Sequence, residues 1–514
     1  MAPAAILPAA VARPGPNLAL ITIAVMLATI MQVLDSTIAN VALPHMQASL
    51  GAARDTITWV LTSYIVASAV ALPLTGWIAD RIGPKRLFLI GIAGFVIASM
   101  LCGLAQSLVQ MILFRVVQGV FGAFLLPLSQ SIMLDSWPRA RHGQAMALWG
   151  MGIMLGPVMG PLIGGWLTEN FDWRWVFFIN LPVGLVAFFL SIATLTEKAK
   201  RIRRFDLFGF ALLAIGVGAL QLMLDRGDRL DWFESPEILF EAGLAISALW
   251  AFAIHTATAR DPIFELAFLR DRNFLVSMIF MFLLGIMLFS SMALLPPMLQ
   301  TLYGYPVLTA GIVVAPRGVG TLIAMGLGGY LAGRIDPRHL VATGIVLTAW
   351  SLYMMTGFSL EMDAMPVVVS GFVQGIAFGL MMVPLNLIAF ATLDPDKRTD
   401  ASSLYSLVRN VGSSIGISIV TFLLARNLQT SHADMAAHVT PFSLPVDPTI
   451  ARQFGAVGDT ALAMLDAEAN RQALMIAYLD DFQLQFWGAL AMLPLVLLLR
   501  KPRGQVDGPV AVGE

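Results

Sequence analysis

Two charged residues interrupt long apolar segments of this chain. Asp35 lies in the stretch MQVLDSTIANVALP, directly after an uncharged run from position 17 to 34, and Arg115 lies in the apolar segment around RVVQG. Ionisable side chains are expensive inside a bilayer and usually mark functional sites. At 1.5 Å per residue, Asp35 lies about 18 residues into one expected helix and Arg115 about eight residues into a helix of opposite direction, so they reach a similar depth.

An acid and an arginine at one depth predict an ion pair. The arginine favours the ionised form of Asp35, whereas burial favours the neutral form. This competition suits a group that must bind and release protons. The alternative is a static pair that fixes the packing of two helices.

Further polar residues inside apolar segments are candidates for contact with a substrate or for coupling: Gln32, Thr37, Asn40, Arg317 and Arg409. The sequence leaves two interpretations open for the two arginines. Each can bind an anion, or each can satisfy backbone carbonyls and a nearby polar group.

The stretch GMGIMLGPVMGPLIGG repeats glycine at every fourth position. Such spacing places a smooth groove on one helix face and permits close approach of a neighbouring helix. Proline inside this segment adds kinks or hinges. Plain tight packing without a gating role explains the spacing almost as well. The residues are Gly152, Gly156, Pro157, Gly160, Pro161 and Gly164.

The stretch GWIADRIGPKR falls in an expected turn between two apolar segments. Its glycines permit close packing, and its charges can connect the ends of neighbouring helices. The alternative is an ordinary positively charged loop with a turn glycine. The residues are Gly76, Asp80, Arg81, Gly83, Lys85 and Arg86.

The composition is that of a membrane protein. Of 514 residues, 58% are hydrophobic and 12% charged, and the mean hydropathy is +0.80, whereas soluble domains carry about 25% charged residues. A net charge of −1 gives no basic field for nucleic acid. The single cysteine, Cys102, excludes an internal disulfide and a cysteine metal cluster. Phosphate-loop, dinucleotide and nucleophile-elbow patterns are absent from the sequence, so we expect no enzyme, no catalytic or metal-binding residue and no cofactor.

Fourteen segments are long and apolar enough for a transmembrane helix, which needs about 20 such residues. They cover approximately 17–40, 57–79, 87–106, 108–134, 143–168, 173–195, 206–225, 237–257, 274–300, 308–332, 340–358, 364–391, 402–425 and 479–499. With the N-terminus inside, roughly three times as many Lys and Arg residues fall in cytoplasmic as in outer loops. We therefore expect both termini in the cytoplasm.

The chain contains an internal repeat. GWIADRIGPKRL at 76–87 recurs as GYLAGRIDPRHL at 329–340, and VVQGVFGAFLLP at 116–127 recurs as FVQGIAFGLMMVP at 372–384. Both pairs are about 255 residues apart, as in transporters built from two related halves. We expect an all-α polytopic membrane protein with an N-terminal tail (1–16), a six-helix half (17–200), two inserted helices (201–260), a second six-helix half (261–500) with a long outer loop at about 426–478, and a C-terminal tail (501–514).

These stretches together resemble the major facilitator superfamily, and more narrowly its fourteen-span drug:proton antiporters of the EmrB-like kind. LDSTIANVALP resembles that family's first-helix signature, GWIADRIGPKR its loop motif, RVVQG its fourth-helix motif, and GIMLGPVMGPLIGG its fifth-helix antiporter motif. The resemblance covers nearly the whole chain. It implies the major facilitator fold.

The resemblance also implies roles at matching positions. Asp35 is implied as the proton carrier, Arg115 as its coupling partner, the fifth-helix glycines and prolines as a hinge and seal, and Asp80 with Arg81 as a latch of the outward-facing state. The second half departs from the pattern, because Gly333 stands where Asp80 stands and Gly371 near the place of Arg115. We therefore expect proton coupling in the first half.

The resemblance further implies export of hydrophobic drugs or toxicants from the bacterial cell across the inner membrane, together with a periplasmic adaptor protein and an outer-membrane channel. Export of one narrow physiological substrate (a lipid, siderophore or metabolite) would use the same motifs and is the alternative. A channel would not need the buried pair. A receptor or scaffold would need a soluble signalling domain.

Overall fold

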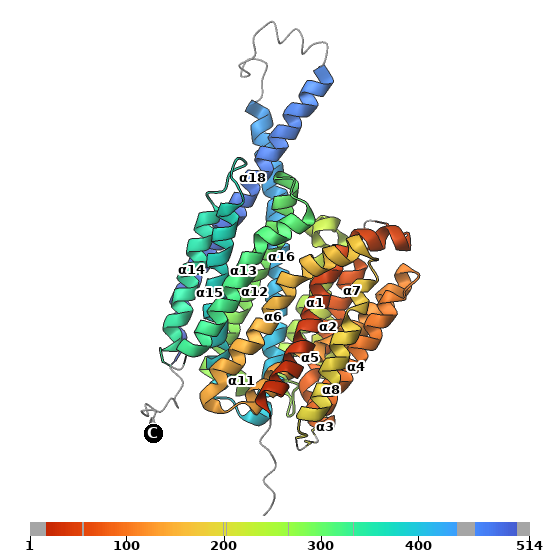
Figure 1. The fold of residues 1–514 in the computed structure, drawn as a ribbon, viewed down its shortest axis with the longest axis vertical. Helices are drawn as coiled ribbons and strands as arrows, with labels where there is room; N and C mark the ends of the chain where they lie inside the picture. Colours follow the sequence, from red (N-terminus) through yellow and green to blue (C-terminus); the bar gives the residue numbers. More distant parts are fainter. Residues whose placement is uncertain are drawn as a thin grey trace, which may run out of the picture.

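The protein is a bundle of long helices arranged as two groups. We describe it from a computed structural model, which covers residues 17–53, 56–198, 200–201, 203–265, 267–332, 334–438 and 458–500. These residues form helices, turns and connecting segments, with no strand among them. Figure 1 shows the early helices and the late helices side by side, with all long axes roughly parallel.

The first group occupies the N-terminal half of the chain. Its helices are α1 (Leu18–Leu50), α2 (Trp59–Ala71), α3 (Leu74–Ile82), α4 (Pro84–Gly103), α5 (Leu108–Ser136), α6 (His142–Asn170), α7 (Trp175–Phe178) and α8 (Asn180–Thr194). Helix α1 begins after Asn17, whose side chain accepts a hydrogen bond from the Leu20 amide, and ends at Gly51, which has a left-handed φ of 60°.

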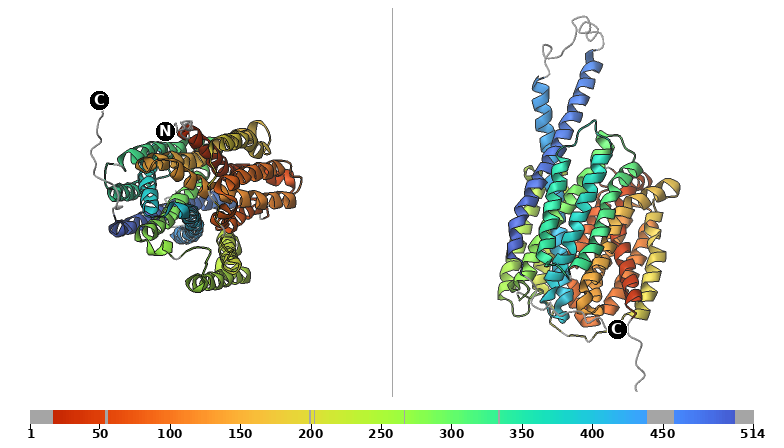
Figure 2. Two further views of the ribbon diagram at one scale, coloured as in Figure 1. Left: turned by 90° about the horizontal axis from the view of Figure 1, so that it is seen from below. Right: turned by 60° about the vertical axis from the view of Figure 1, so that its left-hand side comes forward.

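Two inserted helices and a second group follow. The inserted helices are α9 (Leu207–Arg226) and α10 (Pro236–Thr258), which pack on each other and lie at the periphery of the bundle seen from below (Figure 2, left). The second group contains α11 (Ala267–Arg270), α12 (Arg272–Leu302), α13 (Val307–Leu331), α14 (Pro337–Met355), α15 (Met365–Ala391), α16 (Arg398–His438), α18 (Gly458–Met492) and the 3₁₀ helix η5 (Leu493–Leu498).

Most of these helices match the expected spans. Within the described residues, 12 are long and apolar enough to cross a membrane, and α2 with α3 forms a thirteenth that bends by 58°. The bend lies next to Pro73, which cannot continue the helical hydrogen bonding of α2. The remaining expected span coincides with the 19-residue helix α14, which is less apolar than the others. The fold class is therefore confirmed, and the count of fourteen spans stays a prediction.

Helices α16 and α18 are longer than a bilayer requires. They contain 41 and 35 residues, so α16 alone is about 60 Å long at 1.5 Å per residue, twice the hydrocarbon core. Figures 1 and 2 show both helices projecting from the upper end of the bundle as a pair. His432 of α16 contacts Asp466 of α18 at 2.9 Å in this projecting pair. The expected outer loop is thus largely helical, and residues 439–457 of it lie outside the described chain.

The two groups meet along helices α6 and α13. A side chain at Gly318 of α13 would collide with Val158 of α6, and Gly143 and Gly329 lie in backbone contact near the end of the bundle where α1 begins. We call this the lower end, as drawn in Figure 1, and the opposite end the upper end. Since the sequence predicts a cytoplasmic N-terminus, the lower end is the expected cytoplasmic end.

Candidate functional site

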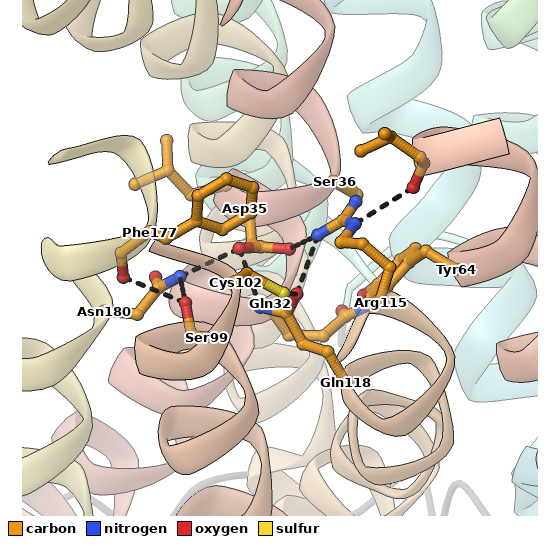
Figure 3. Close-up of polar contacts among 12 residues, drawn as sticks. Gln32, Asp35, Ser36, Tyr64, Ser99, Cys102, Arg115, Gln118, Phe177 and Asn180 are labelled. Carbon is orange, nitrogen blue, oxygen red and sulfur yellow. Dashed lines mark hydrogen bonds and ion pairs between the residues drawn. The ribbon is translucent and has the colours of Figure 1, made fainter. Parts of the chain in front are cut away.

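A buried ion pair lies inside the N-terminal group. Arg115 Nη1 of α5 donates to Asp35 Oδ2 of α1 at 2.7 Å, and both side chains are fully buried. Figure 3 shows the two side chains facing each other between their helices. The estimate of equal depth from helix lengths therefore brought the correct partners together.

Two amide side chains complete the shell around the carboxylate. Gln118 Nε2 of α5 and Asn180 Nδ2 of α8 each donate to Asp35 Oδ1 at 2.9 Å. Asn180 also contacts Ser99 of α4, whose hydroxyl donates to the Phe177 carbonyl. Asp35 of α1 thus accepts hydrogen bonds from side chains of two other helices, α5 and α8 (Figure 3).

Arg115 is held by more than its acid. Its Nε donates to the Val60 carbonyl of α2 at 3.1 Å, and its Nη1 also contacts Gln118 Oε1 at 2.8 Å. The guanidinium lies 4.3 Å from the centre of the Tyr64 ring, which adds a cation–π contact. Within the described residues, its Nη2 has no hydrogen-bond partner. The arginine therefore stays in place through contacts that do not depend on Asp35.

This arrangement stabilises a charged carboxylate and gives its arginine partner other contacts. Three donors, one of them the Arg115 cation, offset the desolvation of Asp35 in its ionised form. A proton on Oδ2 would break the bond to Arg115, while the amides can still donate to Oδ1. Because Arg115 keeps Val60, Tyr64 and Gln118 as partners, the pair can open without leaving a bare guanidinium.

The glycine ladder of α6 lies directly against the helix that carries Asp35. Thr37, two residues after Asp35, donates its hydroxyl to the Gly156 carbonyl at 3.1 Å. A Cβ atom added at Gly160 would lie 2.2 Å from the Thr37 hydroxyl oxygen, and one at Gly164 would lie 2.8 Å from Ile38. Gly152, in contrast, has ordinary clearance to Met26. Three of the four glycines are therefore required for the close contact of α1 with α6.

Pro157 and Pro161 lie inside α6, which continues through both. Proline removes a backbone donor at each position, so the middle of the helix has fewer internal hydrogen bonds. Pro161 also faces Gly311 of α13 across the contact between the two groups.

The other predicted contact residues are more dispersed. Gln32 donates to the Tyr64 hydroxyl at 3.2 Å and so adjoins the ion pair, whereas Asn40 is exposed. Arg317 and Arg409 are nearly fully buried in the second group. Arg317 donates to the Leu288 carbonyl, and within the described residues neither arginine forms an ion pair. Each also has a nitrogen without a partner there, Nη1 in Arg317 and Nε in Arg409.

The charged loop motif connects the two groups through a residue that the sequence analysis did not single out. Arg203, in the segment before α9, contacts Asp80 at 3.2 Å and Asp400 of α16 at 2.8 Å. Gly76 lies so close to Asp400 that an added Cβ would fall 1.5 Å from its carboxylate oxygen. Asp80 therefore reaches the second group through Arg203, and the four residues form what we call the lower latch.

The remaining charges of the motif bind within the first group. Lys85 donates to the Ile192 and Leu195 carbonyls, Arg86 pairs with Glu197 at 2.7 Å, and Arg81 lies over the Trp77 ring. Gly83 has a φ of 100°, which favours glycine at this turn. Gly333, the repeat counterpart of Asp80, lies outside the described residues.

Sequence reasoning missed Gln118, Asn180, Arg203 and Asp400. Neutral amides in apolar segments carry no charge signal, although Gln118 lies within the repeated VQG stretch. Arg203 is one of several basic residues in an expected cytoplasmic loop, so its type alone does not single it out. No group of three or more His, Cys, Asp or Glu residues suited to a metal ion occurs in the described part of the chain.

Comparisons with known proteins place this geometry in a family. The model of the Major Facilitator Superfamily matches residues 25–424. Multidrug export protein EmrB of Escherichia coli strain K12 is 38% identical over 504 residues, covering 96% of this chain and 98% of that protein. Fatty acid resistance protein FarB of Neisseria gonorrhoeae is 37% identical over 492 residues, covering 95% and 97%.

A solved structure shares the fold at low sequence identity. The human organic anion transporter MFSD10 superposes with a TM-score of 0.60 and 15% identity, covering 92% of this chain and all of that chain. The sequence similarity to EmrB proteins over nearly the whole chain, the match to the family model and the shared fold all point to the same family. The chain is a multi-pass membrane protein that belongs to the Major Facilitator Superfamily and, within it, to the family of the EmrB multidrug export proteins.

Proposed function

We propose that this protein exports hydrophobic drugs or toxicants across the inner membrane in exchange for protons, with Asp35 as the proton carrier. The observation that carries the proposal is the fully buried Asp35–Arg115 pair, with its amide donors Gln118 and Asn180. Intramembrane ion pairs of this kind are a recurrent part of proton relays. The names of the EmrB relatives support drugs as cargo.

Protonation and helix movement are linked through α1. Asp35 lies on the same helix as Thr37, which contacts the glycine face of α6, and α6 also packs on α13 of the second group. Loss of the Asp35–Arg115 bond releases α1 from α5, so the α1–α6 contact can shift against the second group. A proton bound at Asp35 thereby favours a different arrangement of the two halves.

The projecting α16–α18 pair supports a role in a tripartite assembly. It extends beyond the upper end of the bundle, the expected periplasmic side (Figure 2, right). In our proposal this pair contacts a periplasmic adaptor protein, which joins the exporter to an outer-membrane channel. Both termini lie in the cytoplasm in this arrangement.

Arg317 and Arg409 favour a second candidate cargo, an amphiphilic carboxylate such as a fatty acid. Both guanidinium groups are buried without an acidic partner in the described residues and retain unused N–H donors. A carboxylate headgroup would satisfy them. The name of FarB, a fatty acid resistance protein, supports this narrower physiological substrate.

The test is export of a fluorescent lipophilic dye from proteoliposomes under an imposed pH gradient. Wild type should drive dye against its concentration gradient, and Asp35→Asn should abolish this while dye binding persists. The control is Asp172→Asn, which changes an exposed carboxylate that pairs with Arg174 instead of Arg115, and this variant should export normally. Uphill export by Asp35→Asn would refute Asp35 as the proton carrier. Competition by a fatty acid then separates the two candidate cargoes.

A further inference from the structure

A second buried acid lies in the C-terminal group, on α18. Asp481 is fully buried, and neither carboxylate oxygen has a hydrogen-bond partner within the described residues. Its neighbour Asp480 is exposed. The sequence places both acids at the start of the last expected span, where an acid is an ordinary feature of a helix end. The structure separates them, because it turns one of the two into the bundle.

Polar side chains of three helices gather on the same side of α18. Gln485, one helical turn after Asp481 and therefore on the same face, accepts a hydrogen bond from Ser291 of α12 at 2.7 Å. Gln374 of α15 donates to Ser291 at 3.2 Å. Within the described residues, Gln485 Nε2 and Gln374 Oε1 have no partner. Asp481, Gln485, Ser291 and Gln374 form what we call the C-half polar cluster.

The C-half polar cluster is the repeat counterpart of the Asp35 site. Gln374 in FVQG occupies the place of Gln118 in VVQG. Gln118 donates to Asp35 on the first helix of its half, and Gln374 donates to Ser291 on α12, the first long helix of the other half. Asn180 and Gln485 reach these same residues from the last helix of each half. The two halves thus build one polar cluster each, but the acid has moved from the first helix to the last.

The second cluster lacks the arginine of the first. Gly371 stands near the place of Arg115, and among the described residues no ion pair involves Asp481. Helix α18 packs on α12, α14 and α16. The titratable neighbours of Asp481 on α18 itself are Tyr478 and Asp480. The helices packed against α18 carry further titratable groups, apart from those in the projecting part of α16: Arg272 on α12; Arg338, His339 and Tyr353 on α14; and Arg398, Asp400, Tyr405, Arg409 and Arg426 on α16.

We propose that Asp481 is a second proton-binding site, which binds one proton in the conformation described here and releases it when the halves rearrange. A buried carboxylate without a cation or donor is strongly disfavoured, and one proton removes the charge. Coupling of this site to export rests on the proposed antiport.

Each acid lies a similar length of helix above the lower end of its own helix. Asp35 is 17 residues after Leu18, the first residue of α1, which corresponds to about 26 Å of α-helix. Asp481 is separated from the end of η5 by 11 residues of α-helix and six residues of 3₁₀ helix, which together correspond to about 28 Å. Asp35 has its charge partner in this conformation and Asp481 has none. One conformation therefore favours an ionised acid in the first half and a protonated acid in the second.

Infrared spectroscopy of the purified full-length protein in lipid tests protonation without any transport. The C=O band of a protonated carboxylic acid should be present at neutral pH in wild type and in Asp480→Asn. In Asp481→Asn the intensity of this band should fall by the contribution of one carboxyl group. Asparagine has the shape of the neutral acid, so the variant should fold. An unchanged band in Asp481→Asn would overturn the proposal.

Transport stoichiometry tests the use of that proton. With the membrane potential clamped at zero, each coupled proton multiplies the limiting gradient of an uncharged dye about tenfold per pH unit. Two protons give about 100-fold per unit, and Asp481→Asn should give about 10-fold, with Asp480→Asn unchanged. Equal gradients in wild type and Asp481→Asn would overturn a coupling role. If wild type itself shows no proton-driven export, the antiport proposal fails while the infrared result still decides whether Asp481 binds a proton.

A third measurement covers the case in which Asp481→Asn does not fold. A hydrophobic carbodiimide reacts with protonated carboxyl groups in apolar surroundings, and mass spectrometry of wild-type protein labelled during dye export should locate the adduct on Asp481. Labelling at other membrane carboxyls with Asp481 unmodified would contradict the proposal.

Discussion

The lower latch should hold the two halves together at the expected cytoplasmic end, and Arg203 should be its critical residue. Arg203 contacts Asp80 of the first group and Asp400 of the second, with side chains that are 28%, 21% and 10% exposed. Arg203→Ala removes the cation that contacts both carboxylates and leaves Asp80 and Asp400 near each other without a direct ion pair. The conformation closed at the lower end should therefore lose stability relative to one in which the halves separate there.

The size of this effect follows from the burial. Removal of one partner from a fully buried pair costs about 3–5 kcal/mol, while exposed pairs contribute about 0–1 kcal/mol. The lower latch is partly buried, so a loss of about 2 kcal/mol is expected. At 1.4 kcal/mol per factor of ten, the ratio of open to closed protein should rise about 30-fold.

The single native cysteine makes a clean assay. In a Cys102→Ser background, a cysteine at Ser131 reports opening, because Ser131 is buried and its hydroxyl contacts Thr399 of the second group at 2.9 Å. Its rate of maleimide labelling should rise about 30-fold in Arg203→Ala while the closed form predominates. The exposed Arg204 lies next in sequence, so Arg204→Ala is the matched control. Equal labelling rates in the two variants would refute the latch.

Two further predictions concern packing and pH. Gly160→Ala should destabilise the protein by about 1–3 kcal/mol, because its Cβ would collide with Thr37. A Cβ at Gly165 meets open space, so Gly165→Ala should leave the stability unchanged. Thermal unfolding in detergent compares the two variants, and equal losses of stability would contradict the close-contact argument. Hydrogen bonds from Arg338 hold the pKa of Asp336 below its ordinary value. Arg338→Ala should therefore lower the free energy of unfolding by its full amount above about pH 4. This difference from wild type should disappear as the pH falls through the lowered pKa of Asp336. A loss that persists at lower pH would exclude this linkage.

The sequence predicted the helices well because apolar length is a strong signal in membrane proteins. It gave no warning of the break between α2 and α3 beyond Pro73, since the two pieces read as one apolar segment. It predicted a long outer segment after position 426, but not that α16 continues unbroken from the bundle into it. Helix continuity depends on tertiary packing as well as on composition.

The Asp35–Arg115 pair was predictable because charges in apolar segments are rare and helix geometry converts position into depth. Gln118 and Asn180 were not, because an amide is tolerated in many environments and gains meaning only from its partner. Arg203 and Asp400 are 197 positions apart, and a basic loop residue offers many candidate acids. Asp481 was visible in the sequence, but its burial depends on how α18 rotates against three other helices.

The inserted helices complicate any simple rocking of two halves. Helix α9 forms a hydrogen bond with the first group, in which Thr62 of α2 donates to Asp225. Two further hydrogen bonds join α9 to α16 of the second group. Gln221 donates to Ser414, and the Leu224 carbonyl accepts from Ser418 at 2.7 Å. These contacts all lie within one turn or two of the upper end of α9. Rotation that separates α2 from α16 there must break one set and keep the other. In the proposed transport cycle the inserted pair therefore moves with one half and becomes part of the surface across which the other half slides, although it stands outside the repeat.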